Sequence, residues 1–241
     1  MQLDFAAREL TLKLVYYGPA LSGKTTNLQS LHDVSAADAT GRLMTLETRD
    51  DRTLFFDLLP LSFEGKNGLR VRIKVFTVPG QVIHASTRRL VLQGADGVAF
   101  IADSRANATE GNAESFRDLR ENLKQNGLNI RSLPLVIQFN KRDLPNARPD
   151  GEIEEQARQG KEPVYLAVAT RREGVVETLM GLLHLTWQAL DARHELSRKL
   201  DLESVPLLEE VLHKLGGAGS LHEVLATRVG AKQLEQVRGK S

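Results

Sequence analysis

The chain has 241 residues, of which 41% are hydrophobic and 26% charged, the composition of an ordinary globular protein with a sizeable core. Its formal net charge is only +1, so charge gives no reason to expect nucleic acid or an acidic membrane as a general partner. The absence of cysteine excludes disulfides and thiolate metal sites. No apolar run is long enough to span a membrane, and we find no signal peptide or common lipidation signal, so we expect a cytoplasmic protein.

A strand, a glycine-rich loop and a helix are predicted in succession near the start of the chain. Residues 10–17 are rich in aliphatic and β-branched side chains, as strands are, and residues 26–32 carry leucines at helical spacing. The loop between them matches the phosphate-binding pattern G-x-x-x-x-G-K-[ST] without a mismatch. We therefore expect Lys24 on the β- and γ-phosphates of a nucleotide and the Thr25 hydroxyl on Mg²⁺. The predicted phosphate-binding residues are Gly18, Pro19, Ala20, Leu21, Ser22, Gly23, Lys24, Thr25 and Thr26.

The middle of the chain predicts a sheet in which most strands are parallel. Two strands separated only by a short turn at 64–68 must pair antiparallel, and Pro60 places the first of them at a sheet edge or near its own end. Two later apolar runs are typical of buried parallel strands. The predicted strands are 10–17, 53–61, 69–77, 97–103, 133–140 and 164–168, and predicted helices contain 26–32, 116–123 and 175–190, the last with Trp187 in the core.

The pattern changes beyond about residue 200. Residues 205–215 predict a short amphipathic helix, and residues 216–219 a flexible glycine-rich break. Ser220, with Glu223 three residues on, predicts the N-cap of a further helix. Three interpretations of this segment stay open: an appendage packed on its own domain, a partner-binding arm, or a helix lying on a membrane surface.

The sequence Asn140-Lys141-Arg142-Asp143 follows a predicted buried strand and matches the pattern N-K-x-D. A carboxylate at Asp143 can accept hydrogen bonds from the N1–H and the 2-amino group of guanine. Adenine lacks both donors, so such a site discriminates strongly against it. The alternative is an exposed charged loop, but a position downstream of a phosphate-binding loop favours a guanine site.

Two further loops carry candidate catalytic groups. In Thr77-Val78-Pro79-Gly80-Gln81, the N–H of Gly80 can contact a γ-phosphate and Gln81 can orient an attacking water. In the charged loop 49–53, Thr53 can supply a second hydroxyl to Mg²⁺, and Arg52 can reach the γ-phosphate and stabilise transition-state charge. The alternatives are a plain turn and a solvated charge cluster.

Together these motifs resemble the MglA family of bacterial Ras-like GTPases of gliding motility and cell polarity. The likeness spans about residues 8–195 and is carried by several motifs, at 18–26, 51–57, 77–81, 102–104 and 138–146. It implies a P-loop NTPase of α/β class, with a Ras-like, six-stranded, mostly parallel sheet covered by helices on both faces. It also implies a cycle between GTP and GDP with Mg²⁺. We assign residues 1–198 to this GTPase domain and residues 199–241 to a helical C-terminal extension.

The resemblance also implies partners and roles for single residues. The family's partners are a roadblock-domain GTPase-activating protein, MglB, and polarity or motility effectors that can recruit the protein to a cell pole or membrane surface. Its D-x-x-G aspartate is replaced by threonine, here Thr77, and Arg52 corresponds to an intrinsic arginine finger. Ala169 aligns with a small residue whose backbone N–H contacts the guanine carbonyl, although its neighbours Val168 and Thr170 depart from the usual S-A-K.

One departure bears on hydrolysis. Ala20 stands where the family has glycine, and its methyl group is expected to crowd Gln81 and the attacking water. The leading hypothesis is a GTP-hydrolysing switch whose catalytic residues are Lys24, Gln81 and Arg52. Its switch loops are expected around 42–58 and 77–93.

Two alternatives remain. One is a binding-only adaptor that stays loaded with nucleotide, which Ala20 favours and an intact Gln81 disfavours. The other is a metabolic P-loop kinase, which would need a lid-like cluster of arginines and would leave Asp143 unexplained.

Overall fold

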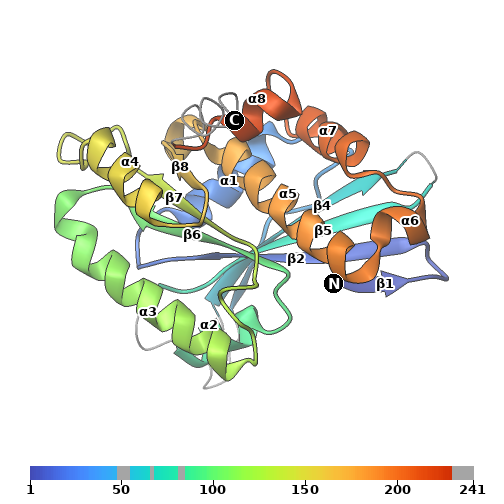
Figure 1. The fold of residues 1–241 in the computed structure, drawn as a ribbon, viewed down its shortest axis with the longest axis horizontal. Coiled ribbons are helices and arrows are strands. Elements are labelled where there is room, and N and C mark those ends of the chain that lie inside the picture. The colour runs from blue at the N-terminus through green and yellow to red at the C-terminus, as the bar shows by residue number, and fades with distance from the viewer. Residues whose placement is uncertain (48–54, 66–67, 81–84, 230–241) are drawn as a thin grey trace, which may run out of the picture.

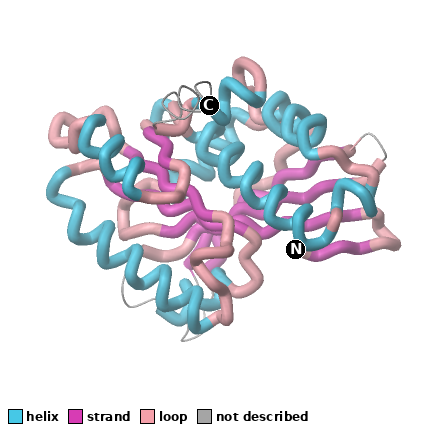
Figure 2. The backbone as a smooth tube through the Cα atoms, viewed as in Figure 1, coloured by secondary structure: helices cyan, strands magenta, loops and turns pink. Residues whose placement is uncertain are grey.

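The fold is a sheet held between two layers of helices (Figure 1 and Figure 2). The computed structural model describes residues 1–47, 55–65, 68–80 and 85–229. In this part of the chain eight strands form one sheet in the order β3-β4-β5-β2-β6-β7-β8, and β1 pairs with β2 outside that path. The strands are β1 (Gln2–Asp4), β2 (Glu9–Tyr17), β3 (Met44–Glu47), β4 (Phe55–Glu64), β5 (Arg70–Thr77), β6 (Gly97–Asp103), β7 (Leu135–Asn140) and β8 (Val164–Leu166).

The sheet has a parallel half and an antiparallel half. Strands β5, β2, β6, β7 and β8 run parallel, whereas β4 pairs antiparallel with both β3 and β5. This confirms the mostly parallel sheet and the antiparallel pair predicted from the short turn at 64–68. The six predicted strands are all present, and the sheet is larger than expected because β1 and β3 add to them. Both are short runs of three and four residues, which give little periodic signal.

The helices divide between the two faces of the sheet. Leucines at 10, 12 and 14 of β2 point into one core with α1, α5, α7 and α8, while Val15 and Tyr17 point into the other with α2, α3 and α4. Trp187 is 1% exposed in the first core, which confirms its predicted packing role. The helices are α1 (Lys24–Val34), α2 (Ala85–Leu92), α3 (Thr109–Gln125), α4 (Asp150–Gln159), α5 (Val175–His194), α6 (Leu196–Leu200), α7 (Ser204–Lys214) and α8 (Leu221–Ala226).

The segments expected as switch loops contain more regular structure than predicted. Strand β3 and the start of β4 lie within 42–58, and α2 lies within 77–93. Strand β4 is one strand in from the sheet edge and Pro60 lies in its middle, which corrects both positions inferred from Pro60, the sheet edge and the strand's own end. However, β3 pairs only with residues 55–58 of β4, and the Pro60 carbonyl accepts a hydrogen bond from Gly41 N at 2.9 Å. Proline is tolerated there because no β3 residue needs its missing N–H.

The C-terminal extension packs on the rest of the chain. The apolar face of α7 is buried in the same core as α5. The Ser220 hydroxyl accepts from the Glu223 N–H in a capping box at the start of α8, as predicted. The predicted boundary at residue 198 falls inside α6, and the division into two domains stays a prediction. In the described part of the chain, no helix is both long and apolar enough to cross a membrane.

Candidate nucleotide-binding site

The predicted phosphate-binding loop joins the end of β2 to the start of α1. Gly18 and Gly23 have φ angles of 148° and 98°, in the region that favours glycine. A Cβ at Gly18 would lie 2.2 Å from the Ile101 carbonyl oxygen, and one at Gly23 would lie 2.2 Å from Asn140 Nδ2. The loop is therefore pressed against β6 and against the predicted base-recognition loop, so both glycines are required by space as well as by conformation.

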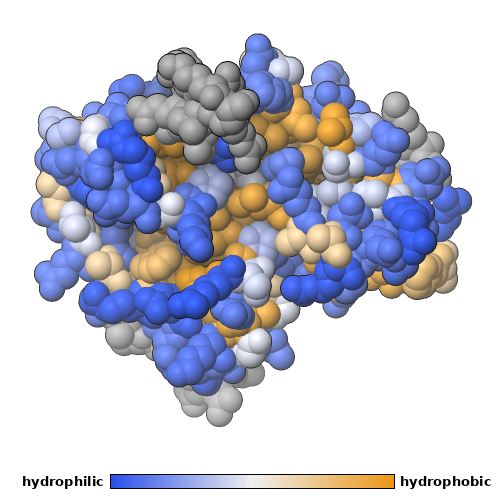
Figure 3. Space-filling view, viewed as in Figure 1, coloured by the Kyte–Doolittle hydropathy of each residue, from blue (hydrophilic) through white to orange (hydrophobic). Residues whose placement is uncertain are grey.

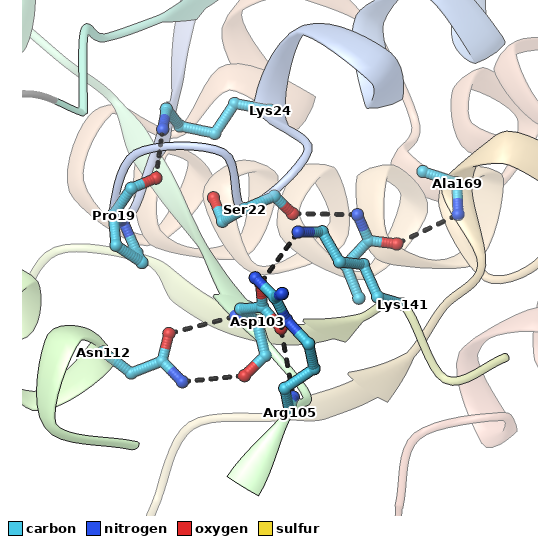
Figure 4. Close-up of polar contacts among 9 residues, drawn as sticks. Pro19, Ser22, Lys24, Asp103, Arg105, Asn112, Lys141 and Ala169 are labelled. Atoms are coloured by element: carbon cyan, nitrogen blue, oxygen red, sulfur yellow. Dashed lines mark hydrogen bonds and ion pairs between the residues drawn. The ribbon is translucent and has the colours of Figure 1, made fainter. Parts of the chain in front are cut away.

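Lys24 lies folded over this loop. Its ammonium group donates to the carbonyl oxygen of Gly18 at 3.0 Å and to that of Pro19 at 2.7 Å, the second of which Figure 4 shows. Burial lowers its pKa to about 8, the nearby Arg88 adds to that shift, and Asp57 opposes it. A buried cation at a helix N-terminus is a favourable place for an anion, because the backbone N–H groups and the lysine point at the same ligand.

A cleft of about 730 Å³ opens beside the loop. The turn after β5 closes one side, since a Cβ on Gly80 would lie 2.3 Å from Ala20 N. The backbone of Gly80 therefore lies close to the backbone of Ala20, the residue expected to affect hydrolysis. The cleft is lined by Ala20, Leu21, Gly23, Lys24, Thr25, Thr26, Thr45, Phe56, Asp57, Thr77, Val78, Pro79 and Gly80.

A larger hollow, of about 1010 Å³, lies elsewhere, at the start of β7 and β8 beside α5. Figure 3 shows apolar side chains gathered in this face of the molecule. Leu133, Pro134, Pro163 and Leu185 line the hollow, and Arg131 and Lys161 stand among them. It contains none of the predicted motif residues, so chemistry rather than size places the nucleotide site at the other end of the strands.

Asp57 is a site residue that we did not assign from the sequence. It lies on β4, is only 7% exposed, and accepts hydrogen bonds from the hydroxyls of Thr25 at 2.6 Å, Thr45 at 2.9 Å and Thr77 at 2.9 Å. The available signal was its position in an alternating strand, because Asp57 shares the buried face with Leu59. A carboxylate on a buried face must be paired or hydrogen-bonded, so an acid at such a position has a specific set of contacts to explain.

These oxygen ligands suit a magnesium ion bound together with phosphates. Mg²⁺ prefers hard oxygen donors and in nucleotide sites uses one or two carboxylates with substrate phosphates. The hydroxyl of Thr25 and the carboxylate of Asp57 are side by side at the phosphate loop. Among the described residues no group of three or more His, Cys, Asp or Glu side chains forms a dedicated metal cage, and a shared ion of this kind does not need one.

The predicted base-recognition loop is joined to the phosphate loop through Asn140. Its side-chain amide donates to the Ser22 carbonyl at 2.9 Å, and its amide oxygen accepts from Ala169 N at 2.9 Å (Figure 4). The N–H of Ala169, expected to contact the guanine carbonyl, is thus donated to Asn140 in this structure. The N–H of Val168 is donated to the Glu173 carbonyl at 3.0 Å. The backbone N–H groups of Val168 and Ala169, both predicted to be nucleotide-binding residues, therefore donate within the protein in this structure, and their contacts with a base stay predictions.

Asp143 stands at the outer end of this loop. Its carboxylate lies 4.0 Å from the guanidinium of Arg171, and its side chain is 23% exposed. The acid is therefore available to a ligand and is flanked by a cation from the turn after β8. The recognition of a guanine base by Asp143 stays a prediction.

A second residue without an assigned role, Asp103, anchors Lys141. The carboxylate of Asp103 accepts from Lys141 Nζ at 2.8 Å and from Arg105 at 2.7 Å, and Asn112 bonds its backbone (Figure 4). Burial by itself would raise the pKa of Asp103, but the hydrogen bonds from Arg105 and Lys141 prevail and lower it to about 2. The carboxylate is thus ionised at neutral pH and fixes the Lys141 side chain beside the base loop.

The structure brings most of the predicted site together at one end of the parallel strands. The phosphate loop, Thr77, Gly80 and Asn140 to Asp143 converge there. Three predicted residues, Gln81, Arg52 and Thr53, lie outside the described residues, so their roles stay predictions.

The sequence is similar to that of a characterised protein. It is 46% identical over 183 residues to the mutual gliding-motility protein MglA of Myxococcus xanthus (strain DK1622). The aligned stretch covers 94% of that protein and 76% of this chain. No family model matches the sequence. About a quarter of this chain therefore lies outside the likeness.

Proposed function

The chain belongs to the MglA family of small GTPases, and from this premise we propose that it is a switch that hydrolyses GTP to GDP and phosphate in cell polarity or motility. The observation that carries the proposal is the pair of hydrogen bonds made by Asn140. They join the phosphate loop and the base loop into one unit, so a ligand that occupies both must carry a purine-like base and a polyphosphate together.

Base choice rests on Asp143. Its carboxylate accepts from N1–H and the 2-amino group of guanine, and ATP would leave this acid unpaired. The stem of Lys141, held by Asp103, covers the face of the base. The 169–171 turn supplies a backbone N–H to the guanine carbonyl once Ala169 exchanges its partner.

The phosphates bind over the loop at residues 18–26. Lys24 turns from the carbonyls of Gly18 and Pro19 to the β- and γ-phosphates. The negative charge of the phosphates favours the protonated ammonium and so raises the lowered pKa of Lys24. Thr25 and Thr53 supply hydroxyl ligands for Mg²⁺, and Asp57 orients that side of the site from β4. When bound, Mg²⁺ neutralises charge on the β- and γ-phosphate oxygens.

Hydrolysis is assigned to residues of the two switch segments. Gln81 orients the attacking water, Gly80 donates its N–H to the γ-phosphate, and Arg52 stabilises the charge that develops in the transition state. The backbone of Ala20 lies close to Gly80, and we expect the Ala20 methyl group to narrow the space for the water. We therefore expect slow intrinsic hydrolysis that a partner accelerates.

The partner class proposed is a roadblock-domain GTPase-activating protein of the MglB type, with polarity or motility effectors that bind the GTP form and set its place in the cell. The alternative, a binding-only adaptor that stays nucleotide-loaded, is favoured by the close contact of Ala20 with Gly80. In that case the protein would present its surface without turning over GTP.

Multiple-turnover phosphate release from GTP, measured with and without a roadblock-domain protein, distinguishes the hydrolysing switch from the binding-only adaptor. We expect a slow basal rate, stimulation by the partner, a gain in rate for Ala20→Gly and losses for Gln81→Leu and Arg52→Ala. An arginine finger is worth on the order of 10³–10⁵ in rate. Unstimulated, GTP-loaded protein would support the adaptor, and an unchanged rate in Arg52→Ala would remove that side chain from the mechanism.

A further inference from the structure

The end of α7 meets the segment that leads from α1 towards β3. The N–H of Ala36 donates to the Lys214 carbonyl at 2.7 Å, and the Lys214 ammonium forms an ion pair with Asp38. A Cβ on Gly216, two residues after α7, would lie 3.1 Å from the carbonyl oxygen of Val34, the last residue of α1. The extension therefore approaches the end of α1 and the short segment after it at three points, which Figure 1 locates between α1 and α7.

The contacted segment is firmly tied to the sheet. The Ala39 carbonyl accepts from Ser62 N at 2.8 Å, and Gly41 N donates to the Pro60 carbonyl at 2.9 Å. The segment continues into β3, where the Thr45 hydroxyl donates to the Asp57 carboxylate at 2.9 Å. Residues 36–45 therefore link the two regions: one end contacts Lys214, and the other contacts Asp57, the acid that accepts a hydrogen bond from Thr25.

Different side chains hold α7 on the core and connect it to residues 35–41. Leu208, Val211 and Leu215 are completely buried, and their packing holds the helix on α5. The Lys214 side chain is 27% exposed, and its ammonium group forms the ion pair with Asp38 in the segment after α1. Buried leucines stabilise far more than an exposed ion pair does, so the loop contact can be weakened while the helix stays in place.

We propose that Lys214 is a positioning residue for the metal side of the nucleotide site. It braces residues 35–41 and so holds β3, with Thr45 against Asp57, in the arrangement that retains Mg²⁺ and the γ-phosphate. The inference rests on the proposed function, because it concerns how that site keeps its nucleotide. It gives the C-terminal extension a role in the switch, since the extension supplies the brace within the same chain.

Charge reversal tests the brace in the full-length protein. Lys214→Glu and Asp38→Lys each place like charges together, whereas the double variant restores an attractive pair. We expect each single variant to release a fluorescent GTP analogue about 3-fold faster at fixed Mg²⁺, within the range of one exposed ion pair. GDP release should change less, because GDP lacks the γ-phosphate, and the double variant should return to the wild-type rate.

A matched control lies just before the extension. Arg198 on α6 and Glu195, the N-cap residue of that helix, form an exposed ion pair at 2.6 Å, away from residues 35–41. Arg198→Glu should therefore leave both release rates and the melting temperature unchanged. A faster GTP release in this control would overturn the specific role of Lys214, since a charge change elsewhere in this part of the chain would then suffice.

Ala36→Pro provides a second, independent variant. It removes the N–H that donates to Lys214, and Ser35 already has the extended conformation (φ −71°, ψ 141°) that a residue before proline adopts. We expect faster GTP release again. The proposal is overturned if the wild type binds GTP and these variants release it at the wild-type rate, or if GTP and GDP release accelerate equally without rescue in the double variant. A wild type that binds no guanine nucleotide would instead refute the proposed function.

Discussion

The two halves of the sheet contribute to the nucleotide site in different ways. In the parallel half, the site residues follow directly after strand ends, as Gly18 follows β2 and Lys141 follows β7. In the antiparallel half, Asp57 and Thr45 stand inside strands and meet because they are register partners across β3 and β4. Groups at strand ends are encoded in contiguous motifs, whereas groups inside strands depend on pairing. The predictions below test whether both halves matter to the ligand.

The largest effect is expected in the parallel half. Asp143→Asn should weaken GTP binding by about 10⁴-fold, because the amide cannot accept from both guanine donors. The same variant should gain affinity for xanthosine triphosphate, which carries a carbonyl in place of the 2-amino group. Competition titrations of variant and wild type measure the relative affinity for GTP and xanthosine triphosphate. Equal GTP affinity in variant and wild type would show that the base does not meet this loop.

The next effect tests the antiparallel half. Asp57→Asn should raise the Mg²⁺ concentration needed for tight GTP binding by about 10–100-fold, the usual result of losing a group that supports metal ligands. Nucleotide affinity measured in excess chelator should change little. Thr45→Val removes one of the three hydroxyls on Asp57 and keeps the carboxylate, so we expect the same change with a smaller magnitude. An unchanged Mg²⁺ dependence would restrict Asp57 to a structural role.

The pH dependence of binding reports on Lys24. In the free protein its pKa is lowered to about 8, mainly by burial, while bound phosphates hold it protonated. GTP affinity should therefore be independent of pH below pH 8 and fall about tenfold per pH unit above it, because binding then requires Lys24 to take up a proton. An exposed lysine would not produce this loss until much higher pH. Calorimetry in two buffers of different ionisation enthalpy measures the proton uptake directly.

The smallest effect concerns Asp103. Its pKa is lowered to about 2 in the folded protein, below the ordinary value of 3.8, so it stabilises the fold above pH 4 and loses that contribution as pH falls towards 2. Asp103→Asn should cost about 2 kcal/mol at neutral pH and less at pH 3. Urea unfolding at both pH values provides the comparison. GTP affinity should fall only a few-fold, since Lys141 remains but is less well anchored.

The sequence predicted the strands of the parallel half well. Strands β6 and β7 are near-continuous apolar runs, and the motifs at 18–26 and 140–143 begin at the ends of β2 and β7, where a local pattern suffices. Helix α4 escaped prediction because Ile153 is its only buried residue, which leaves no apolar stripe to detect. Strand β3 escaped because it is four residues long.

Residue pairings inside the site were beyond sequence reasoning. Asp57 meets Thr25 only when β4 and the phosphate loop are in place, and no local pattern encodes that distance. Ala169 was predicted to contact the base, but its hydrogen bond to Asn140 depends on the approach of β7 to the 169–171 turn, which no local pattern encodes. Likewise, the leucines of α7 predicted an apolar face that needed a cover, and the fold shows that α5 provides it.

The most direct test of the account is a competition titration of the wild-type protein with GTP, GDP and ATP in the presence of Mg²⁺. The account predicts tight binding of both guanine nucleotides and ATP weaker by about 10⁴-fold, since ATP would leave Asp143 unpaired. ATP binding as tight as that of GTP, or no binding of any of the three, would contradict it.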